Sequence, residues 1–252
     1  APIVPVAAPA AVGVDDLRAA LSALVRTTPA AQDRGRARLW VDRVFAATGS
    51  GTVVTGTLTG GVMAADDQVL VGGRPARVRR VQVHGAAVER VAPGHRVALN
   101  LTGVDHTEIE RGHPVVHPDR WHETAVFDAS LHVLASLDHD VSRRGAWMAY
   151  IGSGEVPVRM RVLGTDALSP GSVGAVRIHL PRRLPRVPGD RFVLRESGRG
   201  ETVGGGEVLD VDPVLAAAKA RPDRSWERVV TERGWIDAIA LERLTGETIE
   251  PT

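Results

Sequence analysis

The chain has 252 residues, of which 43% are hydrophobic and 24% charged, so it can bury a sizeable core and is not expected to be disordered. Its 31 basic residues are almost balanced by 30 acidic ones, which excludes a globally basic nucleic-acid-binding protein. The sequence has no cysteine, no apolar run of about 18 residues and no basic region before an apolar stretch at its start. We therefore expect no disulfide, no membrane span and no signal peptide.

Arginine supplies 30 of the 31 basic residues, and Lys219 is the only lysine. Lys219 lies in an Ala-Lys-Ala-Arg sequence, whereas a phosphate-binding loop of the Walker type needs Gly-Lys-Ser/Thr. The composition therefore excludes such a loop, and it excludes lysine-based catalysis unless Lys219 itself serves.

The first 36 residues predict one strand, one helix and a linker. A short β-branched run at residues 2–6 predicts the strand. Asp15 and Asp16 are expected to cap a helix whose apolar residues recur at helical spacing up to Leu24, and Pro29 ends it. The small and polar residues from 27 to 38 indicate a linker.

From residue 39 the pattern changes to short, valine-rich strands bounded by Gly, Pro or Asp. A first block has expected strands at 39–45, 52–59, 68–71, 76–83 and 95–101. A second block has expected strands at 128–134, 146–151, 156–163, 174–180, 191–196 and 202–211. Without helices between them, such strands predict a mainly β fold of two consecutive antiparallel barrels, with domains at 37–120 and 121–212.

A Pro-Gly pair begins the last strand of the first block, at 93–94, and recurs at 188–189 in the second, which predicts type II turns. Residues 213–252 predict the start of a helical domain, with helices at 215–220, 225–233 and 238–244. We expect Asp212 to cap the first of these helices.

No catalytic or metal-binding arrangement is evident in the sequence. His113, His117 and His122 approach the spacing of metal ligands, but prolines at 114 and 118 break any helix that would align them, so we expect histidines at a barrel rim. The run of Ser136, Asp138, His139 and Asp140 contains the residue types of a catalytic triad without the surrounding strand-turn-helix, and it predicts a polar turn. The glycines at 49–51 and 204–206 precede strands, which indicates tight turns or bulges rather than a dinucleotide fingerprint.

The residues from 39 to 58 resemble the opening of the second domain of EF-Tu-like translational GTPases. They contain Val-Asp-Arg-Val-Phe at 41–45 and Gly-Ser-Gly-Thr-Val-Val-Thr-Gly at 49–56. Other motifs are similar to the SelB branch, the selenocysteine-specific elongation factors: Val-Gln-Val-His-Gly at 81–85, Arg-Val-Ala-Leu-Asn-Leu at 96–101, Asp-Arg-Phe-Val-Leu-Arg at 190–195, Thr-Val-Gly-Gly-Gly at 202–206 and Gly-Trp-Ile-Asp at 234–237.

The resemblance extends over nearly the whole chain. Residues 1–36 resemble the last strand and helix of the family's GTPase domain, although Ala7 and Ala8 stand where the family has the Ser-Ala that contacts guanine. The other GTPase motifs, Asp-x-x-Gly and Asn-Lys-x-Asp, are absent from the sequence. The resemblance therefore implies a segment of a longer factor, one without most of the GTPase domain and without the later winged helices, and no catalytic residue in this chain.

The family's second domain helps to bind the aminoacylated 3′ end of tRNA, and motif positions assign that pocket to Asp42, Arg43, His84 and Arg96. A selenol ionises well below the thiol pKa of about 8.5, so a selenocysteine side chain is an anion that an arginine can select over neutral serine. Asp42 would accept hydrogen bonds from the aminoacyl ammonium group. Without the resemblance, Arg43 and Arg96 would be read as solvated residues on the outer face of a strand.

Two further groups of arginines are candidates for contacts with tRNA phosphates. Arg77 and Arg79 are expected on one face of a strand that also contains Arg80. The second group is expected on a loop of the second barrel and consists of Arg182, Arg183 and Arg186. Solvated charge is the alternative for both groups.

The resemblance implies a cytoplasmic translation factor segment that delivers selenocysteinyl-tRNA to the ribosome for selenocysteine incorporation at UGA codons. GTP and Mg²⁺ would bind the intact factor outside this chain, and an mRNA hairpin would be read by later winged-helix domains. No membrane partner is expected. Two alternatives stay open: a general EF-Tu-like factor without a selenocysteine preference, and a non-catalytic β-barrel module that binds another protein.

Overall fold

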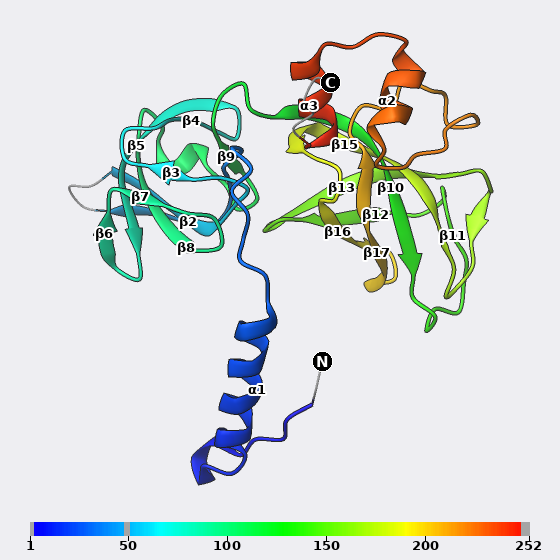
Figure 1. Ribbon diagram of the computed structural model, residues 1–252. Helices are drawn as coiled ribbons and strands as arrows, with labels where there is room; N and C mark the ends of the chain where they lie inside the picture. The colour runs from blue at the N-terminus through cyan, green and yellow to red at the C-terminus, as the bar shows by residue number, and fades with distance from the viewer. Residues whose placement is uncertain (1–2, 48–50, 248–252) are drawn as a thin grey trace. The chain divides into compact units, whose positions relative to one another are not determined.

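The computed structural model describes residues 3–47 and 51–247, which form two compact units, Ala1–Gln32 and Asp33–Thr252 (Figure 1). The first unit contains a 3₁₀ turn, η1 (Ala8–Ala10), and helix α1 (Val14–Thr27). Gly13, at φ 73°, occupies the N-cap position expected for Asp15 or Asp16, which lie in the first turn. The strand expected at residues 2–6 does not form over the described residues 3–6, because the only pairing there is a single bridge between Ala7 and Val12.

Six strands of the second unit form a first barrel in the order β4-β9-β1-β2-β8-β5, and pairing of β4 with β5 closes the ring. These strands are β1 (Arg38–Ala47), β2 (Gly51–Thr59), β4 (Gln68–Val71), β5 (Arg74–Val83), β8 (Arg96–Thr102) and β9 (Pro114–Val116). Strand β6 (Ala86–Val88) extends the sheet beside β5, β3 (Met63–Ala64) pairs with β7 (Arg90–Val91), and η2 (His106–Glu108) is a 3₁₀ turn. Alternate residues of β2 are buried, as in a strand with one face toward the barrel core.

The second barrel closes in the order β10-β15-β13-β12-β16-β17. Its strands are β10 (His122–Val133), β12 (Trp147–Ile151), β13 (Gly154–Leu163), β15 (Val173–Arg186), β16 (Arg191–Glu196) and β17 (Glu201–Asp210). A small ladder joins β11 (Val141–Ser142) to β14 (Ala167–Leu168). The predicted mainly β fold of two antiparallel barrels is therefore confirmed. The four segment boundaries proposed from the sequence stay a prediction.

Gly206 permits a close approach between the backbones of β17 and β10 in the second barrel. A Cβ atom added at Gly206 would lie 1.8 Å from the backbone oxygen of Ser130 on the neighbouring β10. The glycines at 204–206 thus lie within β17 rather than in a tight turn before a strand. The Pro-Gly turns have the predicted geometry, since Gly94 and Gly189 adopt φ values of 94° and 89°. Residues 48–50 of the other glycine motif lie outside the described residues.

The C-terminal region contains two of its three expected helices, α2 (Trp226–Arg233) and α3 (Ala238–Thr245), capped by the side chains of Ser225 and Asp237. The helix expected at 215–220 is wrong, because only one turn forms there. Carbonyl groups of this segment instead accept hydrogen bonds from distant arginines, for example from Arg177 to Leu215 at 2.9 Å. Among the described residues, no helix is both long and apolar enough to cross a membrane.

A buried ion-pair cluster joins the first strand of the first barrel to the second barrel. Arg38 donates to Asp190 at 2.8 and 2.6 Å and to the carbonyl of Pro185 at 2.9 Å. Its guanidinium lies 5.1 Å from the ring centroid of Trp40 and 4.4 Å from that of Trp121. Arg186 approaches the same carboxylate of Asp190 at 3.6 Å, so one aspartate is shared by two arginines.

Candidate functional site

A β-bulge in β1 turns two successive polar residues toward the outside of the first barrel. The pairing with β2 shifts between Val41↔Gly56 and Arg43↔Thr55, which leaves Asp42 as the extra residue. Val41 before the bulge is fully buried, and Val44 after it packs against the core, while Asp42 is half-buried and Arg43 is exposed. A regular strand would point Arg43 inward, so the bulge is what presents both side chains on one face.

Asp42 is held by Arg96 of β8 and Thr55 of β2. The Arg96 guanidinium contacts both carboxylate oxygens, one of them Oδ1 at 3.0 Å, and the Thr55 hydroxyl donates to Oδ1 at 2.6 Å. Burial raises the pKa of Asp42, but the hydrogen bonds from Arg96 and Thr55 and the charge of Arg43 outweigh it, and the pKa lies below its usual value. The carboxylate is therefore ionised at neutral pH. The structure thus brings together Asp42 and Arg96, two of the four residues that the sequence analysis assigned to one pocket.

The other two predicted pocket residues are less tightly engaged. Arg43 is exposed, and its charge acts on Asp42, but within residues 3–47 and 51–247 it makes no hydrogen bond or ion pair. His84 occupies the turn between β5 and β6 at φ 51° and is also exposed. The structure does not bring His84 into hydrogen-bonding contact with the three other residues in the part of the chain it describes.

A second bulge, in β5, presents two arginines beside this group. The pairing of β5 with β8 shifts between Val78↔Leu101 and Arg80↔Asn100, so Arg79 is the extra residue and both Arg79 and Arg80 are exposed. Arg77 and Arg79 lie on either side of the buried Val78 and share the outer face, as expected, but the bulge puts Arg80 on the outer face as well. Arg77 is engaged by Asp66 at 2.7 Å.

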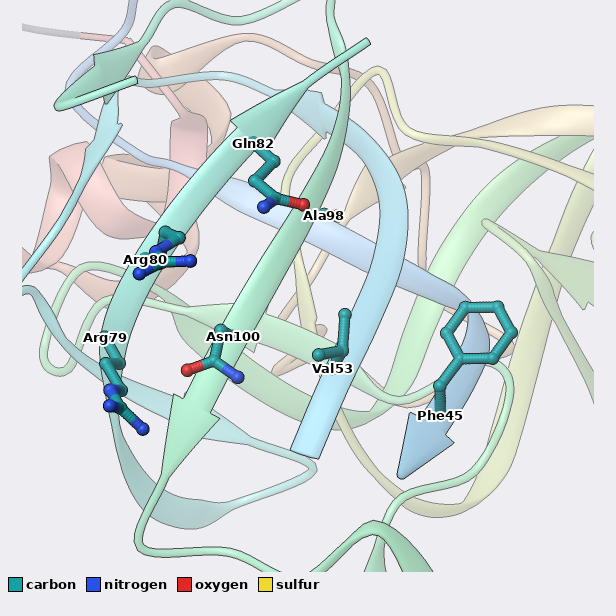
Figure 2. A pocket seen from close by; sticks show the side chains of 7 residues that line it. All are labelled: Phe45, Val53, Arg79, Arg80, Gln82, Ala98 and Asn100. Atoms are coloured by element: carbon teal, nitrogen blue, oxygen red, sulfur yellow. The ribbon is translucent and has the colours of Figure 1, made fainter. Parts of the chain in front are cut away.

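The two arginines line a cavity of about 360 Å³ on the outer face of β1, β2, β8 and β5, which we call the outer-face cavity. Figure 2 shows its lining: Phe45, Val53, Arg79, Arg80, Gln82, Ala98 and Asn100. Phe45, one of three phenylalanines in the sequence, is 46% exposed, so its ring is accessible from solvent. The cavity therefore combines an exposed aromatic ring and apolar floor with cationic and amide groups at its edge, a lining suited to a nucleobase with its phosphate.

The outer-face cavity adjoins the Asp42 network along the same strands. Val53 and Thr55 are two residues apart on β2, and their cross-strand partners on β8 are Asn100 and Ala98. Phe45 and Arg43 are likewise two residues apart on β1, opposite Val53 and Thr55. Residues two apart on a strand share a face, so the cavity and the charged network form one continuous surface.

The second group of predicted phosphate contacts needs a correction. Arg182, Arg183 and Arg186 lie in strand β15, not on a loop. Arg182 and Arg183 are exposed, and Arg183 donates to the carbonyl of Glu123 at 2.9 Å. The side chain of Arg186 is 1% exposed and lies over the ring of Phe127 at 5.4 Å, and burial lowers its pKa to about 10. A phosphate contact by Arg186 is excluded by this burial.

The three histidines with ligand-like spacing are separated in the structure. His113 accepts from the backbone of Glu110 at 3.2 Å, and burial lowers its pKa. His117 contacts Asp67 at 2.9 Å, and His122 lies 3.9 Å from Asp212. They do not form a common site among the described residues.

Sequence reasoning did not find Thr55, Phe45 or Asn100 as site residues. Thr55 and Phe45 lie inside the motif that carries the resemblance, and hairpin pairing around residues 48–50 would have placed Thr55 beside Arg43. The bulges had only a weak signal: at 41–44 and at 78–81, two adjacent polar residues separate two valines, which interrupts the alternation of a regular strand.

Comparisons with known proteins show what the chain is similar to. No protein-family model matches the sequence. The chain is 35% identical over 212 residues to the selenocysteine-specific elongation factor of Desulfomicrobium baculatum, which covers 83% of this chain and 33% of that protein. It is 32% identical over 178 residues to elongation factor Tu 2 of Streptomyces avermitilis, covering 68% of this chain and 45% of that protein.

Two solved structures share the fold. A bacterial selenocysteine-specific elongation factor, EF-Sec, superposes with a TM-score of 0.78 at 23% identity over 96% of this chain and 41% of the other. Apo SelB from Methanococcus maripaludis superposes with a TM-score of 0.70 at 20% identity over 84% of this chain and 51% of the other. At these identities the superpositions establish the fold, which is that of EF-Tu-like second and third domains.

The chain thus spans between a third and about half of the length of the relatives it matches. Its similarity to two kinds of elongation factor indicates a segment of a translation elongation factor. Over most of its own length, the chain is a homologue of the selenocysteine-specific elongation factors.

Proposed function

We propose that the outer face of the first barrel binds the aminoacylated 3′ end of selenocysteinyl-tRNA, as part of a factor that delivers this tRNA to the ribosome for insertion of selenocysteine at UGA codons. The single observation that supports this most is the contact of Asp42, Arg96 and Thr55 directly beside the outer-face cavity. The proposal assigns the aminoacyl group to the charged network and the terminal nucleotide to the cavity.

The charges of the network suit the two ends of a selenocysteinyl group. The ionised carboxylate of Asp42 accepts hydrogen bonds from the α-ammonium group. Arg43, exposed and without an ion pair in the described residues, and the remaining N–H groups of Arg96 face the selenolate. Serine presents a neutral hydroxyl at the same position, so it gains no charge-assisted hydrogen bond from either guanidinium.

The cavity suits the terminal adenosine for a separate reason. An exposed phenylalanine provides a face on which a base stacks, which is worth about 1–3 kcal/mol in nucleic-acid complexes. Arg79 and Arg80 would neutralise the neighbouring phosphates, and their contribution would weaken as salt rises. This part of the surface would not contact the amino acid, so it would bind any aminoacylated tRNA.

The remaining parts of the proposed function lie outside this chain. GTP and Mg²⁺ would be bound by another part of the factor, because the sequence contains no phosphate-binding loop. Recognition of an mRNA hairpin is likewise assigned to further winged-helix domains. The relation to elongation factor Tu 2 supports a second candidate function, a general aminoacyl-tRNA carrier without a preference for selenocysteine.

The experiment that separates these functions compares three ligands with one tRNA body: selenocysteinyl-, seryl- and deacylated tRNA. Affinities of this chain are measured at low salt, for the wild type and for Arg43→Ala and Arg96→Ala. Because Arg96 is 53% exposed, loss of its charge-assisted contact should cost only about 1 kcal/mol, or about 5-fold, on selenocysteinyl-tRNA. The other two tRNAs should be little affected.

Arg90→Ala is the matched control, because Arg90 is an exposed arginine on β7 of the same barrel. It should leave the preference for selenocysteinyl-tRNA unchanged. Equal affinities for selenocysteinyl- and seryl-tRNA in the wild type would favour the general carrier. Absence of tRNA binding to the wild type would contradict both functions.

A further inference from the structure

A cluster of metal-ligating side chains lies on the second barrel, away from the proposed tRNA surface. His139, in the turn between β10 and β11, faces Glu196 at the end of β16 and Glu201 at the start of β17. His139 Nε2 lies 3.3 Å from Glu196 Oε2 and 3.7 Å from Glu201 Oε1. One potential ligand atom from each residue lies within 4.8 Å of the other two.

The two glutamates are arranged at an electrostatic cost. Glu196 and Glu201 are direct cross-strand partners on β16 and β17. Like charges opposite each other on paired strands are destabilising. The side chain of Glu196 is only 15% exposed, so solvent screens the repulsion incompletely. Some positive charge between the two carboxylates would offset this cost.

The histidine does not offset it by a hydrogen bond. His139 Nδ1 lies 2.9 Å from Asp138 Oδ1, and because a carboxylate only accepts, Nδ1 carries the proton of that contact. In the neutral ring Nε2 then bears a lone pair. Both Nε2 and the facing Oε2 of Glu196 are buried and have no hydrogen-bond partner, in spite of their separation of 3.3 Å. With the ring in its neutral form, these two acceptor atoms face one another across a short gap.

The shortest of these separations, 3.3 Å, matches the coordination of a small divalent ion, and the 3.7 Å separation is slightly longer. Zinc bonds to histidine nitrogen and carboxylate oxygen at about 2.0–2.2 Å, so neighbouring ligand atoms of a tetrahedral site lie about 3.3–3.5 Å apart. The contact from Asp138 to Nδ1 is the outer-shell arrangement that orients histidine ligands in zinc sites. Arg199 is the local competitor, since its Nε lies 3.5 Å from Glu196 Oε2 and its Nη1 3.7 Å from Asp138 Oδ1. Three carboxylates and one guanidinium leave two negative charges, which a divalent cation neutralises.

We propose that His139, Glu196 and Glu201 form a binding site for a divalent transition-metal ion, best matched by Zn²⁺, with Asp138 as the residue that orients the histidine. The ion would tie the turn before β11 to the β16–β17 hairpin. Three protein ligands leave one position for water. The site is independent of the proposed tRNA binding, because none of its residues belongs to the first barrel.

The test is a titration of the full chain, free of any affinity tag, with Zn²⁺ by calorimetry and with Co²⁺ by visible absorption, which reports the coordination geometry. The wild type should bind one equivalent, with a rise of several degrees in its unfolding temperature. His139→Gln should abolish this binding, and Asp138→Asn should weaken it about 10- to 100-fold. His106→Gln is the matched control, because His106 also contacts a neighbouring aspartate, Asp105, at 3.2 Å, and it should bind like the wild type.

Several outcomes would overturn the proposal. One is a wild type that takes up no Zn²⁺ at millimolar concentration. Another is binding that His139→Gln and Glu196→Gln leave unchanged, which would indicate adventitious surface sites. If His139→Gln fails to fold, Glu196→Gln still decides the matter, since binding that this variant leaves unchanged would exclude Glu196 as a ligand.

Discussion

Replacement of Arg38 by methionine would test the ion-pair cluster that joins the first strand of one barrel to the other. Arg38 is the principal partner of Asp190, and both side chains are nearly buried, with exposed fractions of 9% and 11%. Methionine keeps much of the length and apolar stem but removes all three hydrogen bonds of the guanidinium. Asp190 would retain Arg186, at 3.6 Å, and the backbone N–H of Val187, at 3.2 Å.

The magnitude follows from burial rather than from the length of the ion pair. Removing one partner of a buried pair costs about 3–5 kcal/mol, because the other charge stays desolvated. The pair between Arg77 and Asp66 has a similar distance of 2.7 Å, but its side chains are 54% and 71% exposed, so Arg77→Met should cost no more than about 1 kcal/mol. We expect Arg38→Met to lower the unfolding temperature by roughly 10 °C and Arg77→Met by about 2 °C.

Thermal unfolding followed by calorimetry measures both changes, with circular dichroism to check that each variant retains its strands. Arg38→Lys, which keeps the charge but not the paired hydrogen bonds, should fall between the wild type and Arg38→Met. Equal destabilisation by Arg38→Met and Arg77→Met would mean that burial does not set the energy of these ion pairs. So would a Met variant as stable as the wild type.

Three further predictions concern other residues. Gly206→Ala should destabilise the chain by about 1–3 kcal/mol or more, because its Cβ would overlap the Ser130 carbonyl oxygen, while Gly198→Ala, with no atom within 4 Å of its Cβ, should not; chemical unfolding compares them. Burial raises the pKa of Asp190, but the charges of Arg38 and Arg186 outweigh this effect, so the folded pKa lies below the unfolded value of 3.8. The contribution of ionised Asp190 to stability is therefore complete above pH 3.8 and is lost as the pH falls through the lower folded pKa. The stability difference between wild type and Asp190→Asn should therefore shrink with acidification below pH 3.8, and a constant difference in unfolding free energy would contradict this. Arg79→Ala should reduce the slope of log affinity for tRNA against log salt by about 1, and an unchanged slope would exclude a phosphate contact by Arg79.

Much of the fold could be predicted because it depends on local sequence features. All eleven strands expected in the two blocks exist, since they coincide with short apolar runs, most of them rich in valine, that Gly, Pro or Asp bound. The helix expected at 215–220 failed for a nonlocal reason. Between Pro213 and Pro222 too few residues remain for a stable helix. In addition, Arg177 and Arg233 donate hydrogen bonds to the carbonyls of Leu215 and Asp212, and such distant donors cannot be inferred from the local sequence.

The candidate site was partly predictable for a different reason. Asp42 and Arg96 came from motif positions, and their contact follows from the register of β1, β2 and β8. The exposure of Arg43 and Arg80 depends on bulges, which change register by one residue and leave only a weak signal in the sequence. For Arg186 the prediction of an exposed phosphate contact failed, because pairing of β15 with β10 buries this arginine against Phe127.

We propose above that the outer face of the first barrel receives the 3′ end of an aminoacylated tRNA. Photo-crosslinking from a tRNA whose terminal adenosine carries a photoreactive group tests it most directly, with the linked peptides identified by mass spectrometry. We expect links to the cavity strands, at or near Phe45, Val53 and Asn100, and their loss in Phe45→Ala. Links confined to the second barrel, or links that Phe45→Ala leaves unchanged, would contradict it.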